Sequence, residues 1–467
     1  MSVHLIAVTA SGGIPLFSRS IGEEETSSIP YSILAALNGV NFFARLNDVN
    51  LMSTSTEKSR THWKVFNDSL VLIMIAKCGR NRSLVSSEVI EKVLDYIHDG
   101  LILTCGPKEI IHFSNVDRLK KSLKNAYNLI DNFLRMVLNE STQLNLYFQS
   151  SNLINVDESI ESNMKTLLES YSNIAMSDFA CLIVNQNIVT ASKGWWTRLS
   201  CSRDSFLLVN YLNSLPSDFF NDVQAEKGRG VREKEVEKGV RMKEVTVFLP
   251  ENAPESVTRV VIINLYTPAS PSPGANFSPS GANFSPSGVN LILLLGEAPS
   301  LEEMKQWSDS LNETIRSVIY QHQFRILCGL QESRGSCLLP IDERIHHLLM
   351  IRHDSNVIFR YGHHLERNKA EHLQQVFNHM LIKRSENKDS DPPRDNPPRD
   401  NPSKDNPINE EQFVRLSHCL VHKSSSTDLT LVICVGPDVK IPLVTTMARR
   451  TRSLLKDKKT IPNLKVQ

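Results

Sequence analysis

The sequence lacks a long hydrophobic run, a basic leader and an excess of charge of either sign. Its longest apolar stretches, LVLIMIA at 70–76 and LILLLG at 291–296, fall short of the roughly 18 residues that a transmembrane helix needs. The apolar run from Val3 to Val8 has no cationic segment before it and predicts a first strand, not a signal peptide. Lysine and arginine number 52 against 51 acidic residues. We therefore expect a cytoplasmic chain that binds no nucleic acid.

The short motifs of phosphate-binding, dinucleotide-binding and hydrolytic enzymes are also missing. The sequence contains no GxxxxGK[ST] loop, no GxGxxG after a strand, no HExxH and no GxSxG. Its eight cysteines are scattered without a CxxC pair, which favours reduced thiols in the core over a zinc ribbon or a disulfide framework. We expect no catalytic residue, no cofactor, no bound metal and no enzyme activity.

Histidines gather in the C-terminal part of the sequence, after Asp342. They are His346, His347, His353, His363 and His364. In a helix over 341–350, Asp342 lies one turn before His346, a spacing that a metal site can use. Adjacent histidines on a helix point about a hundred degrees apart, so neither adjacent pair chelates one ion in a simple geometry. The pattern favours surface histidines over a zinc site.

The length of 467 residues exceeds what one hydrophobic core usually supports, so several domains are expected. Three segments are poor in residues that pack: a mixed-charge run at 226–244, a GANFSPS repeat at 272–291 and a PPRDN tandem at 390–407. We interpret them as solvated loop insertions. A short-motif ligand in the PPRDN tandem is the less favoured interpretation.

The first block of the sequence reads as a hairpin, a helix, three strands and two helices. The predicted elements are strands at 3–9 and 14–20, a helix at 29–40, strands at 47–55, 61–67 and 69–77, and helices at 86–103 and 116–137. Asn38 and Gly39 predict a left-handed end for the first helix, and Ser114 with Asp117 predicts a capping-box-like start for the last. This order predicts a five-stranded antiparallel sheet with flanking helices.

The same order recurs twice in outline. The second block has a leading helix after residue 150, a hairpin at 179–192, a helix at 204–214, strands at 244–250, 258–266 and 289–296, and a helix at 300–327. The less regular third block has helices at 341–350, 367–383 and 441–455 and strands at 355–362, 412–422 and 428–435. We interpret it as a degenerate third copy. The predicted fold class is α+β, with modules at 1–140, 150–330 and 338–467 and a disordered insertion at 385–410.

The sequence KGWW at 193–196 directly follows a predicted hairpin. On a strand or loop, Trp195 and Trp196 point in opposite directions, so one enters the core and the other remains at the surface as a partner anchor. The alternative is that both indoles pack a helix onto the sheet. Neither interpretation is favoured by the sequence.

The C-terminal segment is the one strongly basic stretch of the sequence. Its cations, against the single acid Asp457, are Arg449, Arg450, Arg452, Lys456, Lys458, Lys459 and Lys465. Such a cluster predicts contact with an anionic lipid surface or an acidic partner. The alternative is a helix end whose cations complement the helix dipole, followed by a frayed tail.

Four strings carry a resemblance to a known family: LNGVNFF at 37–43, WKVFNDSLVLIMI at 63–75, VDRLKKSLKNAYNLIDNFL at 116–134 and IVTASKGWW at 188–196. In this order they resemble the Fuzzy family of planar-cell-polarity effector proteins, whose modules are longin domains. The resemblance implies three longin-like modules and a role at the ciliary base, at the basal body and in association with the cytoskeleton. It also implies pairing with an Inturned-like longin protein, a WD-repeat subunit in the same complex, and a Rab-like small GTPase as its target.

The leading hypothesis is therefore a non-catalytic subunit that recruits or activates a Rab-like GTPase. A second hypothesis is a longin-type membrane-traffic adaptor that binds cargo or SNAREs without acting on a GTPase. A third is a hydrolase whose residues come together only in three dimensions. Nucleotide exchange requires a complementary surface and no covalent catalysis, which agrees with the missing motifs.

Overall fold

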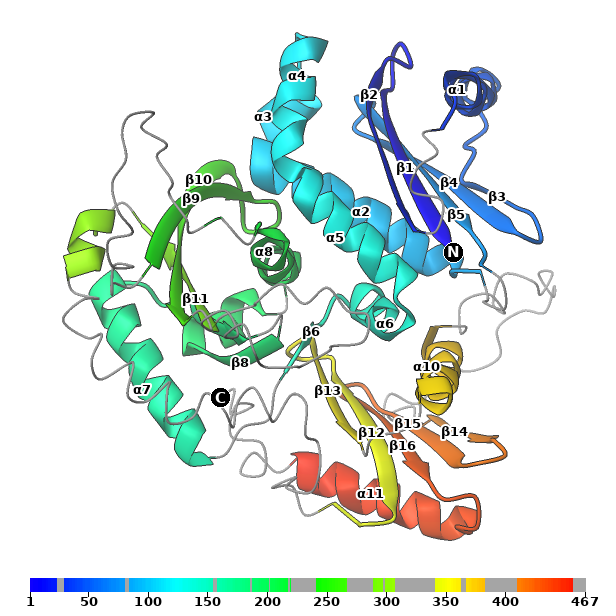
Figure 1. Cartoon of the computed structure of the whole chain (residues 1–467), viewed down its shortest axis with the longest axis vertical. Coiled ribbons are helices and arrows are strands. Elements are labelled where there is room, and N and C mark those ends of the chain that lie inside the picture. The colour runs from blue at the N-terminus through cyan, green and yellow to red at the C-terminus, as the bar shows by residue number, and fades with distance from the viewer. Residues whose placement is uncertain are drawn as a thin grey trace, which may run out of the picture.

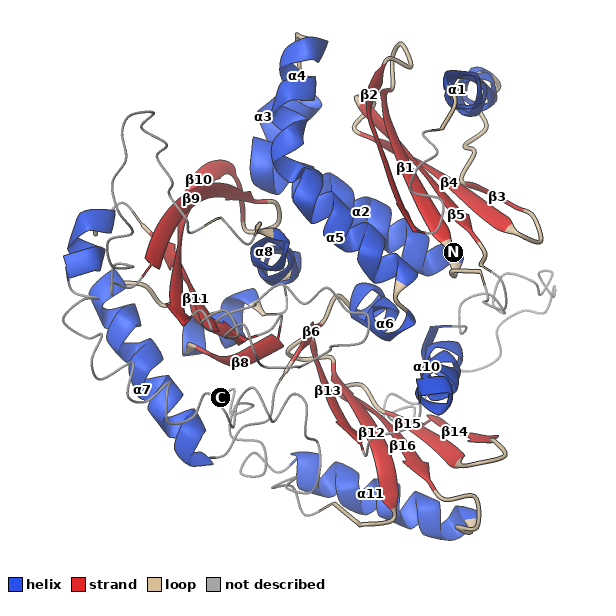
Figure 2. Ribbon diagram, in the orientation of Figure 1, coloured by secondary structure: helices blue, strands red, loops and turns tan. Residues whose placement is uncertain are grey.

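The three sheets of the protein share one strand order in the computed structural model. It describes residues 1–22, 29–79, 84–153, 158–184, 187–200, 202–216, 219, 241–266, 289–296, 299–306, 341–362, 367–382 and 410–456. In each module a hairpin is followed by a helix and three strands, and the last strand pairs beside the first strand of the hairpin. Figures 1 and 2 show the sheets arranged around a central group of helices. The predicted α+β fold with a repeated module is confirmed.

The first sheet has the order β2-β1-β5-β4-β3, and its neighbouring strands are antiparallel. Its strands are β1 (Ser2–Thr9), β2 (Pro15–Gly22), β3 (Ser53–Ser55), β4 (Ser59–Phe66) and β5 (Leu70–Lys77). β1 and β5 form its centre and are apolar over most of their length, because helices cover both faces. These helices are α1 (Tyr31–Leu46) on one face and α2 (Ser87–Cys105) with α5 (Tyr127–Leu138) on the other.

The second sheet has the equivalent order β8-β7-β11-β10-β9. Its strands are β7 (Ala180–Val184), β8 (Asn187–Ala191), β9 (Arg241–Leu249), β10 (Ala253–Tyr266) and β11 (Val289–Leu295). The helix α7 (Glu158–Ala175) and the helical residues 301–306 cover its outer face. The helix α8 (Arg203–Ser214) covers the inner face and joins the central helices. The remainder of the helix predicted at 300–327 lies outside the described residues.

The third sheet repeats the order as β13-β12-β16-β15-β14 and gains an additional edge strand, β6 (Ser151–Asn152), parallel to β13. Its own strands are β12 (Ile345–Arg352), β13 (Val357–Gly362), β14 (Glu410–Arg415), β15 (Leu420–Ser425) and β16 (Leu429–Val435). The helices α10 (Arg367–Ile382) and α11 (Ile441–Lys456) pack on it. The third block is thus a copy of the first two in topology, with one strand borrowed from the segment after the first module.

The first helix is longer than predicted, because Asn38 and Gly39 do not end it. α1 continues to Leu46, and the left-handed backbone position lies at Asp48, with a φ of 55°. The Asn38 side chain instead packs against the tight β1–β2 turn, where a Cβ on Gly13 would come within 2.0 Å of Asn38 Nδ2. The predicted stop is therefore wrong.

The helix predicted at 116–137 is interrupted by a 3-10 turn at Lys124–Ala126, which separates α4 (Val116–Leu123) from α5. Its cap is Asn115, not Ser114, because the Asn115 Oδ1 accepts the backbone N–H groups of Asp117 and Arg118 at 2.9 and 3.0 Å. Two short helices that the sequence did not predict, α3 (Pro107–Ile111) and α6 (Glu140–Phe148), flank this region.

The prediction of a helix at 341–350 is wrong, because residues 345–352 of this segment form the central strand β12. Its run of Leu348, Leu349, Met350 and Ile351 is buried on both faces of the sheet, between β13 and β16. A short apolar run of this kind is compatible with a buried helix or a buried strand. The strand predicted at 412–422 is in fact the hairpin of β14 and β15.

No helix among the described residues has the length and apolar character needed to cross a bilayer.

The central helices join the modules through two different kinds of contact. Between the first and second modules, the rings of Tyr96 (α2) and Phe206 (α8) lie 5.0 Å apart, and both rings contact Phe133 of α5. Beside them, Arg203 Nη1 donates to Asp99 Oδ2 at 2.6 Å. This joint combines a buried aromatic cluster with a charge pair at its edge.

The joint between the first and third modules is polar. Arg360 Nη2 of β13 donates to the backbone oxygen of Ser141 in α6 at 2.6 Å, and Asn378 Nδ2 of α10 donates to the Glu140 oxygen at 2.9 Å. The segment after α6 pairs with β13 through β6 and bridges to β8 at Leu153 and Ile188. It therefore connects the edges of the second and third sheets.

His62 on β4 is buried in the first module and makes its folding sensitive to acid. Burial, reinforced by the nearby Arg60 charge, lowers the pKa of His62 from 6.5 to about 4. The folded chain therefore holds this imidazole neutral at a pH where the unfolded chain protonates it. The contribution of the neutral His62 to the free energy of unfolding is therefore fully present above pH 6.5. It is lost as the pH falls from 6.5 to about 4.

We expect His62→Gln to reduce this acid sensitivity, because glutamine cannot take up the proton. One proton contributes at most about 1.4 kcal/mol per pH unit to the free energy of unfolding. The measurement is the urea midpoint of both chains at neutral pH and near pH 5. Equal losses of stability on acidification in the two chains would contradict the assignment.

Candidate partner-binding surface

The helix that follows the first hairpin occupies the same place in each module, but its surroundings differ. In the second module this helix is α8, which packs on α5. In the third it is α10, which packs on α6. In both modules, the side of this helix that faces away from its own sheet is therefore covered by a helix of the first module. The equivalent helix of the first module, α1, lies at the periphery in Figure 1.

The outer side of α1 is apolar. Its only charged residue is Arg45. The large apolar side chains that are exposed on the helix and the segment after it are Ile33, Val40, Phe42, Phe43, Leu46, Val49 and Met52, here named the α1 surface. Phe43 is 69% exposed and Leu46 is 68% exposed. Large apolar side chains gathered on an exposed side of a helix have the character of a contact with another protein.

Hydrogen bonds hold the α1 surface in place. Trp63 of β4 donates its indole N–H to the Leu37 oxygen at 3.2 Å and its backbone N–H to the Met52 oxygen at 2.9 Å. On the inner side, Leu34 packs into the apolar cluster between α1 and the sheet. At the end of the helix, Arg45 Nη2 pairs with Asp68 Oδ1 at 3.0 Å. The apolar residues are therefore presented on a preorganised helix.

The sequence did not predict this surface, although LNGVNFF at 37–43 belongs to it. The predicted helix end at Asn38 and Gly39 removed Phe42, Phe43 and Leu46 from the helix. Asn38, Asn41 and Arg45 recur at steps of three and four residues, a pattern that predicts a polar outer face, but Asn38 and Asn41 face the first module. The available signal was the group of large apolar residues, Val40, Phe42, Phe43 and Leu46, in a helix with a single charge.

The tryptophans Trp195 and Trp196 do not form an exposed anchor, so the anchor interpretation is wrong. They begin a π-helical turn, Trp195–Leu199, in which both indoles are buried, at 0% and 7% exposure. Because the backbone is helical, the two side chains do not alternate between the core and the surface as they would on a strand. Both belong to the core between the second sheet and the central helices.

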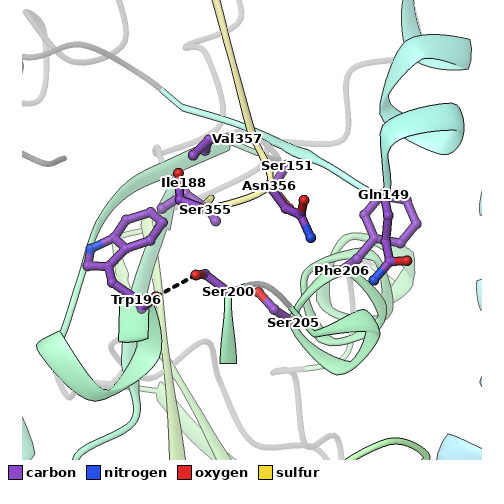
Figure 3. Close-up of a pocket in the computed structure, with 10 residues that line it drawn as sticks. All are labelled: Gln149, Ser151, Ile188, Trp196, Ser200, Ser205, Phe206, Ser355, Asn356 and Val357. Atoms are coloured by element: carbon purple, nitrogen blue, oxygen red, sulfur yellow. Dashed lines mark hydrogen bonds between the residues drawn. The ribbon is translucent and has the colours of Figure 1, made fainter. Parts of the chain in front are cut away.

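Trp196 also lines a small gap where the modules meet, shown in Figure 3. The lining residues are Gln149, Ser151, Ile188, Trp196, Ser200, Ser205, Phe206, Ser355, Asn356 and Val357. Ser200 Oγ donates to the Trp196 oxygen at 2.6 Å. The gap is too narrow to admit a water-sized sphere, so it is a seam between packed modules and not a ligand site.

The histidine segment has a different geometry from the one the sequence suggested. His346 and His347 lie near the start of the strand β12 and not on a helix, at a point where the pairing with β16 is irregular between Ile345 and His347. Asp342 pairs with Arg344 at 2.6 Å, and His353 Nε2 lies 3.0 Å from Thr430 Oγ1. The described residues include no group of three or more side chains placed to hold a metal ion. His363 and His364 lie outside the described residues.

The C-terminal cations are divided between the surface and the interior of the third module. Arg449 and Arg450 are exposed on α11, while Arg452 is partly buried. Burial lowers the pKa of Arg452, with Glu411 acting in the opposite direction. The backbone of Lys456 ends α11, and Lys458, Lys459 and Lys465 lie outside the described residues.

Two family models match the chain in succession. The first longin domain of FUZ, MON1 and HPS1 matches residues 3–133, and the second longin domain of the same proteins matches residues 176–313. These stretches contain the first and second sheets. The α1 surface therefore lies within the match to the first longin domain.

The chain is also similar to curated proteins of the Fuzzy family. The chain is 34% identical over 215 residues to the protein fuzzy homolog of Xenopus tropicalis, covering 46% of this chain and 48% of that protein. It is 32% identical over 223 residues to the human protein fuzzy homolog, covering 47% and 50%, and 33% identical over 222 residues to the mouse one, covering 47% and 51%. The chain spans about half the length of the curated relatives it matches.

We expect Trp195→Ala to destabilise the protein by about 3 to 5 kcal/mol, because it leaves a large cavity in the core. Phe43→Ala serves as the control, since its ring is exposed and its loss changes stability by about 0.5 kcal/mol or less. Thermal melting followed by circular dichroism compares the two variants. An unchanged melting temperature for Trp195→Ala would contradict the buried position.

Proposed function

The chain belongs to the Fuzzy family of longin-domain proteins, and on that basis we propose that it is a non-catalytic subunit of a planar-cell-polarity and ciliogenesis effector complex. In this role it pairs with an Inturned-like longin protein and is joined by a WD-repeat subunit. The assembly recruits or activates a Rab-like small GTPase and supports ciliary and vesicle transport. It acts in the cytoplasm at the base of the cilium, at the basal body and in association with the cytoskeleton.

The α1 surface is the observation that supports pairing through the first module. The two equivalent helices within the chain, α8 and α10, each bury their outer sides against other helices. Among the described residues, no helix covers the outer side of α1. Its exposed apolar residues are complementary to a helical face of another longin module. Phe42 and Phe43 have the size that interface anchors usually have.

The α1 surface also limits the way in which a GTPase is approached. The segment from Val49 to Met52 leads directly into β3, a short edge strand whose residues are all exposed. A partner that covers α1 therefore also reaches the free edge of the first sheet. Prising the switch loops of a GTPase from its nucleotide needs such a composite surface and no acid, base or nucleophile. The heterodimer, and not this chain alone, is the unit that acts.

We expect the double variant Val40→Asp and Phe43→Asp to bind the Inturned-like partner at least about tenfold more weakly, since two carboxylates would be desolvated at the contact. The fold is retained, because these side chains are 54% and 69% exposed in the free chain. Co-purification and isothermal titration calorimetry of the purified chains measure the loss.

The matched control is Met176→Asp, which places a carboxylate on an apolar residue that is 71% exposed in the second module. It should bind as tightly as the unchanged chain. Full affinity in the double variant, or an equal loss in the control, would rule out the α1 surface as the contact.

The GTPase step is tested separately, by release of a fluorescent nucleotide from Rab-like GTPases. We expect the heterodimer to accelerate release and the single chain to have little effect. A stable heterodimer that accelerates release from no Rab-like GTPase would leave the pairing intact. It would favour the adaptor that binds cargo or SNAREs.

A further inference from the structure

Three helices lie on the outer faces of the three sheets, and their exposed sides differ in chemistry. α1 exposes large apolar side chains, and α7 exposes polar residues such as Thr166 and Glu169. α11 exposes two neighbouring arginines, Arg449 and Arg450. The polar side of α7 is typical of a helix surface that contacts only solvent. The basic side of α11 suggests a partner of opposite charge.

An apolar stripe anchors α11 to the third sheet. Its buried residues are Val444, Met447, Ala448, Thr451 and Leu455. They recur at steps of three and four residues and face β15 and β16. Because this side holds the helix in place, the opposite side is free to contact another surface without unfolding of the module.

The exposed side of α11 has an apolar start followed by the basic pair. Ile441 is 44% exposed and Leu443 is 38% exposed. About two turns further on, Arg449 and Arg450 are exposed. The helix contains no acidic residue between Ile441 and Lys456. An exposed helical side with cationic residues and no acid is attracted to anionic lipid headgroups.

Arg449 and Arg450 are only loosely paired with acids among the described residues. Arg449 Nη2 lies 3.8 Å from Glu411 Oε1, and the Arg449 side chain is still 76% exposed. Asp342 is already paired with Arg344, whose guanidinium, with a smaller contribution from Arg450, lowers the pKa of that carboxyl.

Beneath this pair, Arg452 adds a further positive charge. Its Nε and Nη2 are buried without a hydrogen-bond partner among the described residues. Arg344 and Arg450 lie near Asp342, and Arg449 and Arg452 lie near Glu411. The two exposed arginines of α11 place a positive field on the outer side of this helix.

We propose that the exposed side of α11 docks on an anionic membrane surface, with Arg449 and Arg450 against the lipid headgroups and Leu443 at the level of the interface. A lipid surface fits better than an acidic protein because the two exposed apolar residues lie in the first turn, about two turns before the arginines, and form no central apolar patch. α11 and α1 lie at opposite ends of the molecule in Figure 1, so a membrane on α11 leaves the α1 surface open to its partner.

The test is co-sedimentation of the full chain with vesicles of phosphatidylcholine alone or mixed with phosphatidylserine. We expect binding to the mixed vesicles that weakens with added salt, and little binding to the neutral ones. The double variant Arg449→Glu and Arg450→Glu should lower the vesicle partition coefficient at least about tenfold. Leu443→Ser should lower it less.

The matched control is Lys121→Glu with Lys124→Glu, which changes the same amount of charge at two exposed lysines of the first module. It should retain binding to the mixed vesicles. Three outcomes would overturn the proposal: no binding by the unchanged chain, equal binding to neutral vesicles, or full binding by the arginine variant. Loss of an acidic protein from the arginine variant, with vesicle binding unchanged, would assign the surface to that protein instead.

Discussion

The burial of α5 holds the three modules in one arrangement. This helix contacts the first sheet, α2, α6 and α8, and Phe133 at its middle is fully buried between Tyr96 and Phe206. The inner face of the first sheet and the inner face of the second are therefore covered by one shared layer of helices. Losing that layer would expose the apolar side of both sheets at once, so the modules are not independent in stability.

The shared layer also explains why a repeated fold presents different surfaces. A longin-type module has a helix on each face of its sheet, and only one of these helices can face the centre of the molecule. In the second and third modules the helix after the hairpin faces inward, whereas in the first module it faces outward as α1. The outer sides of the outward helices α1, α7 and α11 are therefore exposed, and their chemistry differs: apolar on α1, polar on α7 and basic on α11.

The repeat, the antiparallel sheets and most helices could be predicted from the sequence, because period-two and period-3.6 patterns mark one buried face. Prediction failed where both faces of a strand are buried, and where a local sequence signal for a helix end competed with tertiary packing. The run around Leu349 has no alternation, so its sequence is equally compatible with a helix. Asn38 and Gly39 have the sequence of a helix end, but the packing of Asn38 against Gly13 continues the helix. The prediction of the binding site was wrong for the same reason. Trp195 is a residue type typical of interface anchors but is buried in the core, whereas Phe43 is a residue type typical of the core but is exposed. Composition alone does not say which side of a helix another module will cover.

The polar joint between the first and third modules restricts how these copies can pack. The Arg360 guanidinium is buried, and burial lowers its pKa to about 10. Its acceptors are the Ser141 backbone oxygen, Gln374 Oε1 and Asn145 Oδ1, which are neutral and come from α6 and α10. A shift of α10 along α6 by one turn would separate this charge from its acceptors, and an unpaired buried charge costs several kcal/mol. Apolar contacts between α6 and α10 alone would tolerate such a shift. The third module is therefore held in one register, which keeps α11 on the side of the molecule opposite to α1.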